Sequence, residues 1–213
     1  MFLCRLKHVC VLIIIAFLLF GCGGSKIPGL NVKDYEKKGV RLVALMPVDN
    51  KTKDANAATV LRREVLNALY FKGYPKIPLD VIDEKTAEIY KEKAGPKRGH
   101  IPPGVLGELL GVDAVMYCTL ERWDTSYLYV SAKTAVSATF ELRSTKTGET
   151  LWSAEDKITE RHYDFTGKRL EMKSRQVYEP IMQEIITKAM STLPDGPDAI
   201  VKTPSKKSWW KFW

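Results

Sequence analysis

The stretch VSAKTAVSATFEL, residues 130–142, decides the fold that this sequence predicts. Side chains of two kinds alternate along it. The even positions are Val130, Ala132, Thr134, Val136, Ala138, Phe140 and Leu142, and the odd positions from Ser131 to Arg143 are mostly polar or charged. Because successive side chains of a strand point to opposite faces, the pattern indicates a long strand with one apolar and one wet face.

The same period extends on both sides of this stretch. Residues 113–160 predict three long strands in an antiparallel meander, because apolar and polar residues alternate through most of their length. The segment STKTG, residues 144–148, predicts a hairpin turn, with Gly148 at the position that needs a positive φ.

The N-terminal half predicts strands of another kind. VRLVALMPV, residues 40–48, is a nearly continuous apolar run closed by Pro47, which is typical of a strand covered on both faces in a parallel sheet. YPKIPLDVI, residues 74–82, predicts a second strand, at an edge because of its two prolines. Helical spacing predicts helices at 58–69 (ended by Gly73), 83–94, 104–111 and 174–193. The fold class is therefore α/β, a mixed sheet with a parallel N-terminal part, a C-terminal antiparallel meander and helices packed on it.

The N-terminus predicts export and a lipid anchor. Arg5 and Lys7 precede an uncharged run from residue 9 to 20, which is the layout of a signal peptide and too short for a spanning helix. The following Leu-Phe-Gly-Cys resembles a lipobox, so we expect lipidation of Cys22. The alternative is an ordinary secretory signal that ends near a cysteine. Gly23, where aspartate would favour the inner membrane, favours the outer membrane.

These features divide the chain into four segments. Residues 1–21 are the expected signal peptide, 22–39 a lipidated tether, 40–193 the α/β domain and 194–213 a flexible basic tail rich in tryptophan. The formal charge of +8 is concentrated at the two ends, which leaves about +2 on residues 22–198. A nearly neutral body lacks the basic footprint of a nucleic-acid binder, so no nucleic-acid partner is expected.

The tail combines the residues that favour a membrane interface. Tryptophan prefers the headgroup region and lysine is attracted to anionic lipid. We therefore expect a membrane or partner contact through Lys206, Lys207, Trp209, Trp210, Lys211, Phe212 and Trp213. The alternative is a tail that docks its aromatic rings on the parent domain or on a partner.

No catalytic set is visible in the sequence. His100, His162 and Cys118 do not have the spacing of metal ligands, and the glycine-rich segments match neither a P-loop nor a dinucleotide fingerprint. Cys118 lies in the apolar run AVMYCTL, where a buried inert thiol is expected. We therefore expect no metal, no cofactor and no enzymatic activity.

Five residues are candidates for a ligand site or an interface: Pro47, Asn50, Trp123, Tyr127 and Tyr129. The first two follow a predicted buried strand, where ligands of α/β sheets often bind. Residues of this kind also commonly end a strand and cap the next helix. The three aromatic residues lie in the predicted meander, where they could pack, form a dimer seam or hold a ligand.

Three motifs carry a family resemblance: VALMPVDN (43–50), GELLGVDAVMYCTLERWDTSY (107–127) and STKTGETLW (144–152). They resemble a bacterial lipoprotein family of unknown function, the GNA-type surface lipoproteins, over roughly residues 35 to 193. The fold of that family is similar to the N-terminal domain of TolB and the periplasmic domain of the curli secretion lipoprotein CsgG. The resemblance implies an α/β lipoprotein that tends to form homodimers and takes part in a multi-lipoprotein envelope assembly.

Two functions remain open at this stage. One is a non-catalytic interaction or assembly lipoprotein of a secretion or cell-surface complex, anchored in the outer membrane, facing the periplasm and partnered by other envelope proteins. The other is a periplasmic module that binds a small ligand or a glycan such as peptidoglycan.

Overall fold

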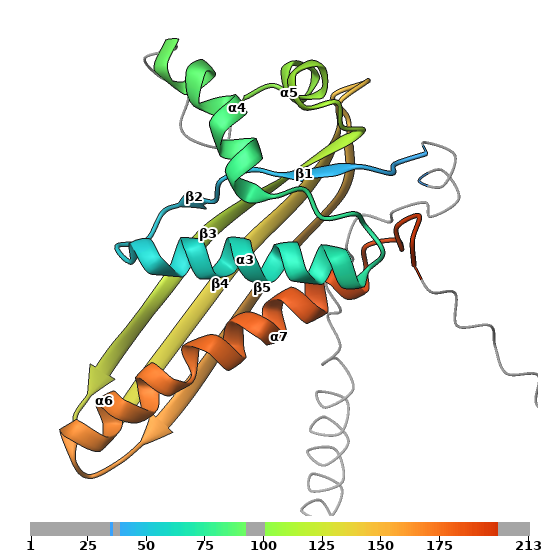
Figure 1. Cartoon of the computed structure of the whole chain (residues 1–213). Helices are drawn as coiled ribbons and strands as arrows, with labels where there is room; N and C mark the ends of the chain where they lie inside the picture. The colour runs from blue at the N-terminus through green and yellow to red at the C-terminus, as the bar shows by residue number, and fades with distance from the viewer. Residues whose placement is uncertain (1–34, 36–38, 93–100, 200–213) are drawn as a thin grey trace, which may run out of the picture.

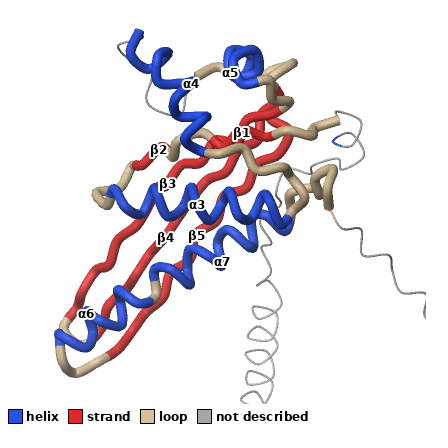
Figure 2. Tube along the Cα trace, viewed as in Figure 1, coloured by secondary structure: helices blue, strands red, loops and turns tan. Residues whose placement is uncertain are grey.

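The computed structural model describes residues 35, 39–92 and 101–199 as one mixed sheet with helices on its faces (Figures 1 and 2). The strands follow the order β1-β3-β4-β5, and the short β2 also pairs with β3. The predicted signal peptide, most of the tether including Cys22, and residues 200–213 of the tail lie outside the described residues.

The C-terminal meander forms the body of the sheet, as predicted. β3 (Ala114–Leu128), β4 (Ser131–Ser144) and β5 (Thr150–Tyr163) run antiparallel, and β4 is the inner strand. Gly148 has φ +72° in the turn between β4 and β5, which confirms the left-handed position predicted for it. The β3 pairing shifts register between Leu120 and Arg122, an irregularity that re-aims the side chains that follow.

The parallel part of the sheet is shorter than the sequence predicts. β1 (Val43–Leu45) pairs in parallel with the start of β3, and β2 (Asp49–Asn50) pairs further along the same strand. Pro47 lies between the two short strands and has no backbone N–H to donate to a continuous ladder, which accounts for the interruption.

The strand predicted at residues 74–82 is wrong. The chain is irregular from Tyr74 to Pro78, and α4 (Leu79–Glu92) begins directly after the second proline. Pro75 and Pro78 cannot donate to a ladder, whereas a proline just before the first helical turn costs no hydrogen bond. The helix predicted from residue 83 therefore starts four residues earlier.

The helices cover the two faces of the sheet unequally. α3 (Ala55–Phe71), α6 (Gly167–Gln176) and α7 (Tyr178–Ser191) lie along one face, whereas α4 and α5 (Pro103–Leu110) cover only one end of the other (Figure 1). The larger core lies under α3 and α7 and includes Leu61, Phe140 and Ile185. A smaller core under α4 and α5 includes Ile82 and Val115.

The C-terminal helix predicted at 174–193 is two helices in the structure. α6 starts at Gly167, and Val177 separates it from α7. The helix predicted from the apolar spacing after Val177 is confirmed, because Ile181, Ile185 and Ala189 of α7 are buried against the sheet.

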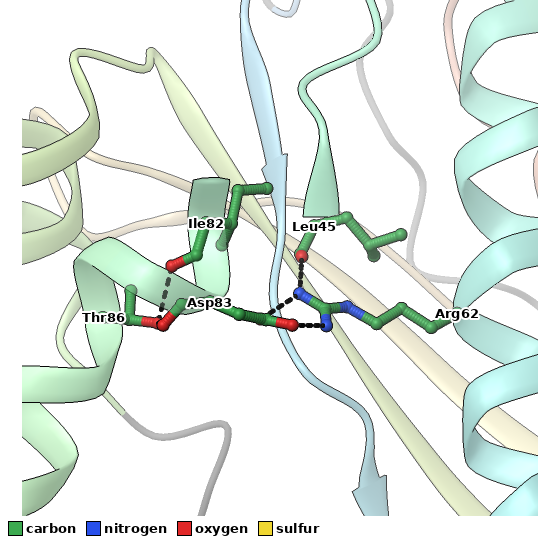
Figure 3. Close-up of polar contacts among 5 residues, drawn as sticks. All are labelled: Leu45, Arg62, Ile82, Asp83 and Thr86. Atoms are coloured by element: carbon green, nitrogen blue, oxygen red, sulfur yellow. Dashed lines mark hydrogen bonds and ion pairs between the residues drawn. The ribbon is translucent and has the colours of Figure 1, made fainter. Parts of the chain in front are cut away.

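Arg62 joins three elements at the centre of the domain (Figure 3). Its guanidinium on α3 donates to both carboxylate oxygens of Asp83 on α4 at 2.7 Å and to the Leu45 carbonyl of β1 at 3.0 Å. The Arg62 side chain is only 11% exposed, whereas Asp83 is 47% exposed. This fork is the geometry in which arginine binds a carboxylate most specifically.

The chain after α7 stays against the body as far as Ala199. Gly196 N–H donates to the Lys72 carbonyl at 2.7 Å, and Asp198 N–H donates to the Gly73 carbonyl at 3.0 Å. Gly73 has φ +88°, and a Cβ there would lie 2.2 Å from the backbone nitrogen of Ala199. Residues 194–199, predicted as the start of a flexible tail, thus pack on the end of α3 in the structure.

Candidate functional site

An open groove of about 770 Å³ lies on the helix-covered face, between the start of α3 and the junction of α6 with α7. It is lined by Lys53, Asp54, Ala55, Asn56, Trp123, Asp124, Thr125, Tyr127, Ser174, Arg175 and Tyr178. We call it the aromatic groove. Three segments distant in sequence build it: the loop before α3, the second half of β3 and the α6–α7 junction.

A stacked aromatic pair forms the floor of the groove. The rings of Trp123 and Tyr178 lie 4.4 Å apart at centroid with an interplanar angle of 24°. Trp123 follows the register shift of β3, and Tyr178 is the first residue of α7 after the break at Val177. The two local irregularities therefore bring the rings together, and the stack rigidifies the floor.

Hydroxyl groups extend the floor toward α6. Thr125 Oγ1 shares hydrogen bonds of 2.8 Å with the Tyr178 hydroxyl and with Thr134 of β4. The hydroxyls of Tyr127 and Ser174 share a bond of 2.9 Å. Burial raises the pKa of Tyr178 above the usual tyrosine value, so its hydroxyl stays protonated at neutral pH. These groups satisfy one another and hold the groove in shape.

The N-terminus of α3 forms the opposite wall. The Asp54 carboxylate caps the helix, accepting from the N–H groups of Asn56 and Ala57 at 2.9 and 3.1 Å. Lys53 and Asn56 are exposed at the rim. Two further charged rim residues already have partners: Asp124 pairs with Arg122 and Arg175 pairs with Glu171. The rim is thus mixed in charge around an aromatic floor.

The five sequence-predicted candidates do not form one site. Trp123 and Tyr127 line the aromatic groove, whereas Tyr129 lies at the hairpin between β3 and β4 and is 96% exposed. Asn50 organises the loop before α3: its side chain accepts from Thr52 and donates to the Asp54 carbonyl. Pro47 lies between β1 and β2.

Sequence reasoning missed Tyr178, Ser174 and Asp54. The alternation of Trp123, Thr125 and Tyr127 signals that one face of β3 is aromatic, but nothing local shows what covers that face. Tyr178 is 53 residues from Thr125 in sequence, and only the packing of α7 brings them together. The tail residues predicted to contact a membrane or partner, 206–213, lie outside the described residues.

A smaller cavity of about 320 Å³ lies on the other face, beside the loop that leads into α5. The Tyr117 hydroxyl donates to the Ile101 carbonyl at 2.6 Å. Arg143 Nε lies 3.4 Å from Glu141 and is buried without a hydrogen-bond partner among the described residues. None of the five candidate residues from the sequence lines this cavity.

The described residues hold no cluster with metal-binding geometry, since no three His, Cys, Asp or Glu side chains among them converge. Cys118 is buried, and burial raises the pKa of its thiol to about 12, as expected of an inert core cysteine. Across the same described ranges, we find no helix with the length and apolar character that a bilayer crossing needs.

A mixed sheet layered by helices, with an open aromatic groove on one face, defines an α/β domain. The chain belongs to the family described as "Putative lipoprotein GNA1162-like", whose sequence model matches residues 32–207. The predicted family is thereby confirmed, and membership implies a lipid-anchored protein of the cell envelope.

Comparisons with lipoproteins of Neisseria meningitidis agree with this assignment. The chain is 26% identical over 142 residues to "Putative lipoprotein NMB1124/NMB1162" of Neisseria meningitidis, covering 67% of this chain and 66% of the relative, just under two thirds of its length. The crystal structure of lipoprotein GNA1162 from Neisseria meningitidis matches with a TM-score of 0.51 at 26% identity, covering 66% of this chain and 97% of that one. The PelC dodecamer from Paraburkholderia phytofirmans is more distant, with a TM-score of 0.48, 17% identity and coverage of 80% and 96%.

Proposed function

We propose that this chain is a non-catalytic envelope lipoprotein that binds another envelope protein through the aromatic groove, as a component of a multi-lipoprotein assembly. Cys22 would hold it in the outer membrane with the domain facing the periplasm. The family supports the lipid anchor. The groove supports the binding role.

The observation that supports the proposal is that the hydroxyl groups in the groove are already hydrogen-bonded within the protein. The hydroxyls of Thr125, Tyr178, Tyr127 and Ser174 are bonded to one another. A site for a small polar ligand needs a few convergent polar groups left free to fix its orientation. A wide groove with an aromatic floor and a charged rim suits the core and rim of a protein interface instead.

Glycan binding is the second candidate, and one observation favours it. Tyr127 is 53% exposed, so much of its ring surface faces the groove and solvent while its hydroxyl is held by Ser174. A sugar ring could lie on such an aromatic surface. The two candidates use the same groove and differ in what occupies it.

A photocrosslinking experiment in native membranes tests the proposal. A crosslinking amino acid at Asn56, exposed on the rim, should capture a defined partner protein, whereas the same group at Lys146, in the exposed turn between β4 and β5, should not. With the captured partner purified, Tyr127→Ala should weaken its binding about tenfold or more, as expected for loss of an aromatic contact. Equal capture at both positions would contradict the proposal.

The glycan alternative is tested on the same protein. Trp123 on the groove floor should report an occupant by its fluorescence. Titration with peptidoglycan fragments should leave the emission unchanged if the groove binds protein. A saturable shift that Tyr127→Ala abolishes would instead establish the glycan function and exclude the proposed one.

A further inference from the structure

The far end of the meander carries a group of exposed apolar side chains. Leu128, Tyr129 and Val130 form the β3–β4 hairpin, and Tyr163 and Phe165 lie where β5 leads into α6. Figure 1 shows these segments together at the end of the molecule away from α4 and α5. The Asp164 N–H donates to the Val130 carbonyl at 3.0 Å, so the two loops are in contact. We call these five residues the apolar tip.

The apolar tip is unusually exposed. Tyr129 and Phe165 are each 96% exposed and Leu128 is 66% exposed, although large side chains of this kind normally lose most of their contact with water on folding. They project from two adjoining loops at a convex end, whereas the aromatic groove is a hollow on the helix-covered face. A contiguous apolar patch of this kind marks a contact with a membrane or another molecule.

The backbone of the β3–β4 hairpin is strained at Tyr129, one of these exposed residues. Leu128 pairs with Ser131, so Tyr129 and Val130 are a two-residue loop, where glycine and asparagine are the usual residues. Tyr129 has φ +42°, a conformation that a bulky side chain rarely adopts. A bulky, exposed tyrosine therefore occupies a turn position that local backbone preference would give to glycine or asparagine.

Unpaired cations surround the apolar tip. Lys133 of β4 and Arg161 of β5 are directly opposite each other in the sheet, an arrangement of like charges that is unfavourable without a counter-charge. Lys168 and Arg169 are exposed in the first turn of α6. In the described part of the chain these four cations make no ion pair, whereas the nearby acids Asp164 and Glu171 pair with Lys173 and Arg175.

We infer that the apolar tip inserts into the headgroup region of an anionic lipid bilayer, with Lys133, Arg161, Lys168 and Arg169 contacting lipid phosphates. Exposed aromatic rings flanked by basic residues are the composition of an interfacial membrane contact. The charges argue against a second copy of this chain as the occupant, because a contact between two tips would bring cations of the same sign together. An anionic surface complements them.

The length of the chain permits this contact together with the proposed lipid anchor. Cys22 and the buried Tyr35 are thirteen positions apart, and a chain of that length spans at most about 45 Å. The 14 residues of β4 extend over roughly 45 Å as well. A tether of this reach would allow a lipid on Cys22 and the apolar tip to meet one bilayer. The contact would then orient the sheet and the aromatic groove relative to the membrane.

A depth measurement on the full lipidated chain tests the inference. Tyr129→Cys carrying an environment-sensitive fluorophore is reconstituted into vesicles of phosphatidylcholine with phosphatidylglycerol. We expect a blue-shifted emission that nitroxide-labelled lipids quench. The matched control is Lys146→Cys, exposed in the turn at the other end of β4, whose label should be neither shifted nor quenched. An unquenched label at position 129 would overturn the inference.

Reversing the charges beside the apolar tip tests whether these cations contribute to lipid insertion. Lys168→Glu with Arg169→Glu changes two exposed side chains without described partners and should leave folding intact. It should lower the equilibrium constant for insertion at least about thirtyfold, since losing the attraction of each basic residue to anionic lipid accounts for about fivefold and the introduced carboxylates add repulsion. A blue shift at position 129 that instead appears without lipid and grows with protein concentration would assign the patch to self-association and refute insertion.

Discussion

Arg62 is the charged residue on which the packing of the domain depends most directly. Its fork links α3 to Asp83 of α4 and to the carbonyl of Leu45 in β1. We expect Arg62→Ala to lower the free energy of unfolding by about 2–3 kcal/mol, because a mostly buried hydrogen-bonded charge is lost while Asp83 remains partly in water. Urea unfolding followed by circular dichroism measures the change.

Arg63 provides a matched control for this prediction. It is the next residue on α3, but its side chain is 62% exposed and pairs only with its neighbour Glu64. Arg63→Ala should change the free energy of unfolding by less than about 0.5 kcal/mol. Similar losses for both variants would mean that the fork contributes no more than a surface pair.

Cys118 should behave as a core residue in its chemistry. We expect no alkylation by iodoacetamide at neutral pH in the folded protein and rapid alkylation in urea, since burial raises the thiol pKa to about 12. The unfolded thiol ionises near pH 9, so the contribution of Cys118 to stability is complete below that pH and declines as pH rises toward 12. In Cys118→Ala, this contribution to the loss of stability at alkaline pH should be absent. Fast alkylation of Cys118 in the folded natural chain would contradict the prediction.

At the scale of elements, the loop before α3 builds both a helix end and a wall of the aromatic groove. Asp54→Ala removes the side chain that accepts from Asn56 and Ala57 N–H, and we expect a loss of about 1 kcal/mol in urea unfolding. Asp54→Asn keeps an acceptor at the same position and should stay close to the natural protein. An equal loss in both variants would show that the charge, not the cap, stabilises this end.

The elements also show where local sequence information is sufficient. The period of two in residues 130–142 correctly predicts β4 and its apolar face, because the apolar side chains are buried under the helices. The face predicted to be wet is partly covered, since Ala135 and Ser137 are also buried. At residues 74–82 the apolar run is the same length as a strand, but the prolines and the following α4 decide the outcome. A short apolar run does not by itself distinguish a buried strand from the start of a helix.

At the scale of the whole molecule, we expect Cys22 to carry the anchor. Metabolic labelling with a palmitate analogue should mark the natural chain and not Cys22→Ser, and high salt should not release the labelled protein, because a covalent lipid is held by apolar transfer and not by charge. A Cys22→Ser chain that retained the label would exclude lipidation at this residue.

Self-association is the second expectation at this scale. The physical reason lies in β5, whose 14 residues form an edge of the sheet in the described part of the chain, while β4 is the inner strand. A long edge presents unpaired backbone groups that a second copy can cover. Light scattering of the chain without lipid should therefore report a dimer or larger state.

The tip variant supplies the control for this measurement. Lys168→Glu with Arg169→Glu alters only the surface beside the apolar tip, so it should leave the oligomeric state unchanged while it weakens lipid insertion. A uniform monomer at micromolar concentration would count against self-association in either protein.

The sequence by itself determined the α/β class, the meander, the buried Cys118 and the family, because each depends on local composition, on a period within one element or on motifs in order. The tertiary structure decided the rest. Trp123 meets Tyr178, and Tyr127 meets Ser174, only because α6 and α7 fold back along the sheet. Contacts between residues some 50 positions apart depend on how whole elements pack, and no local pattern records that packing.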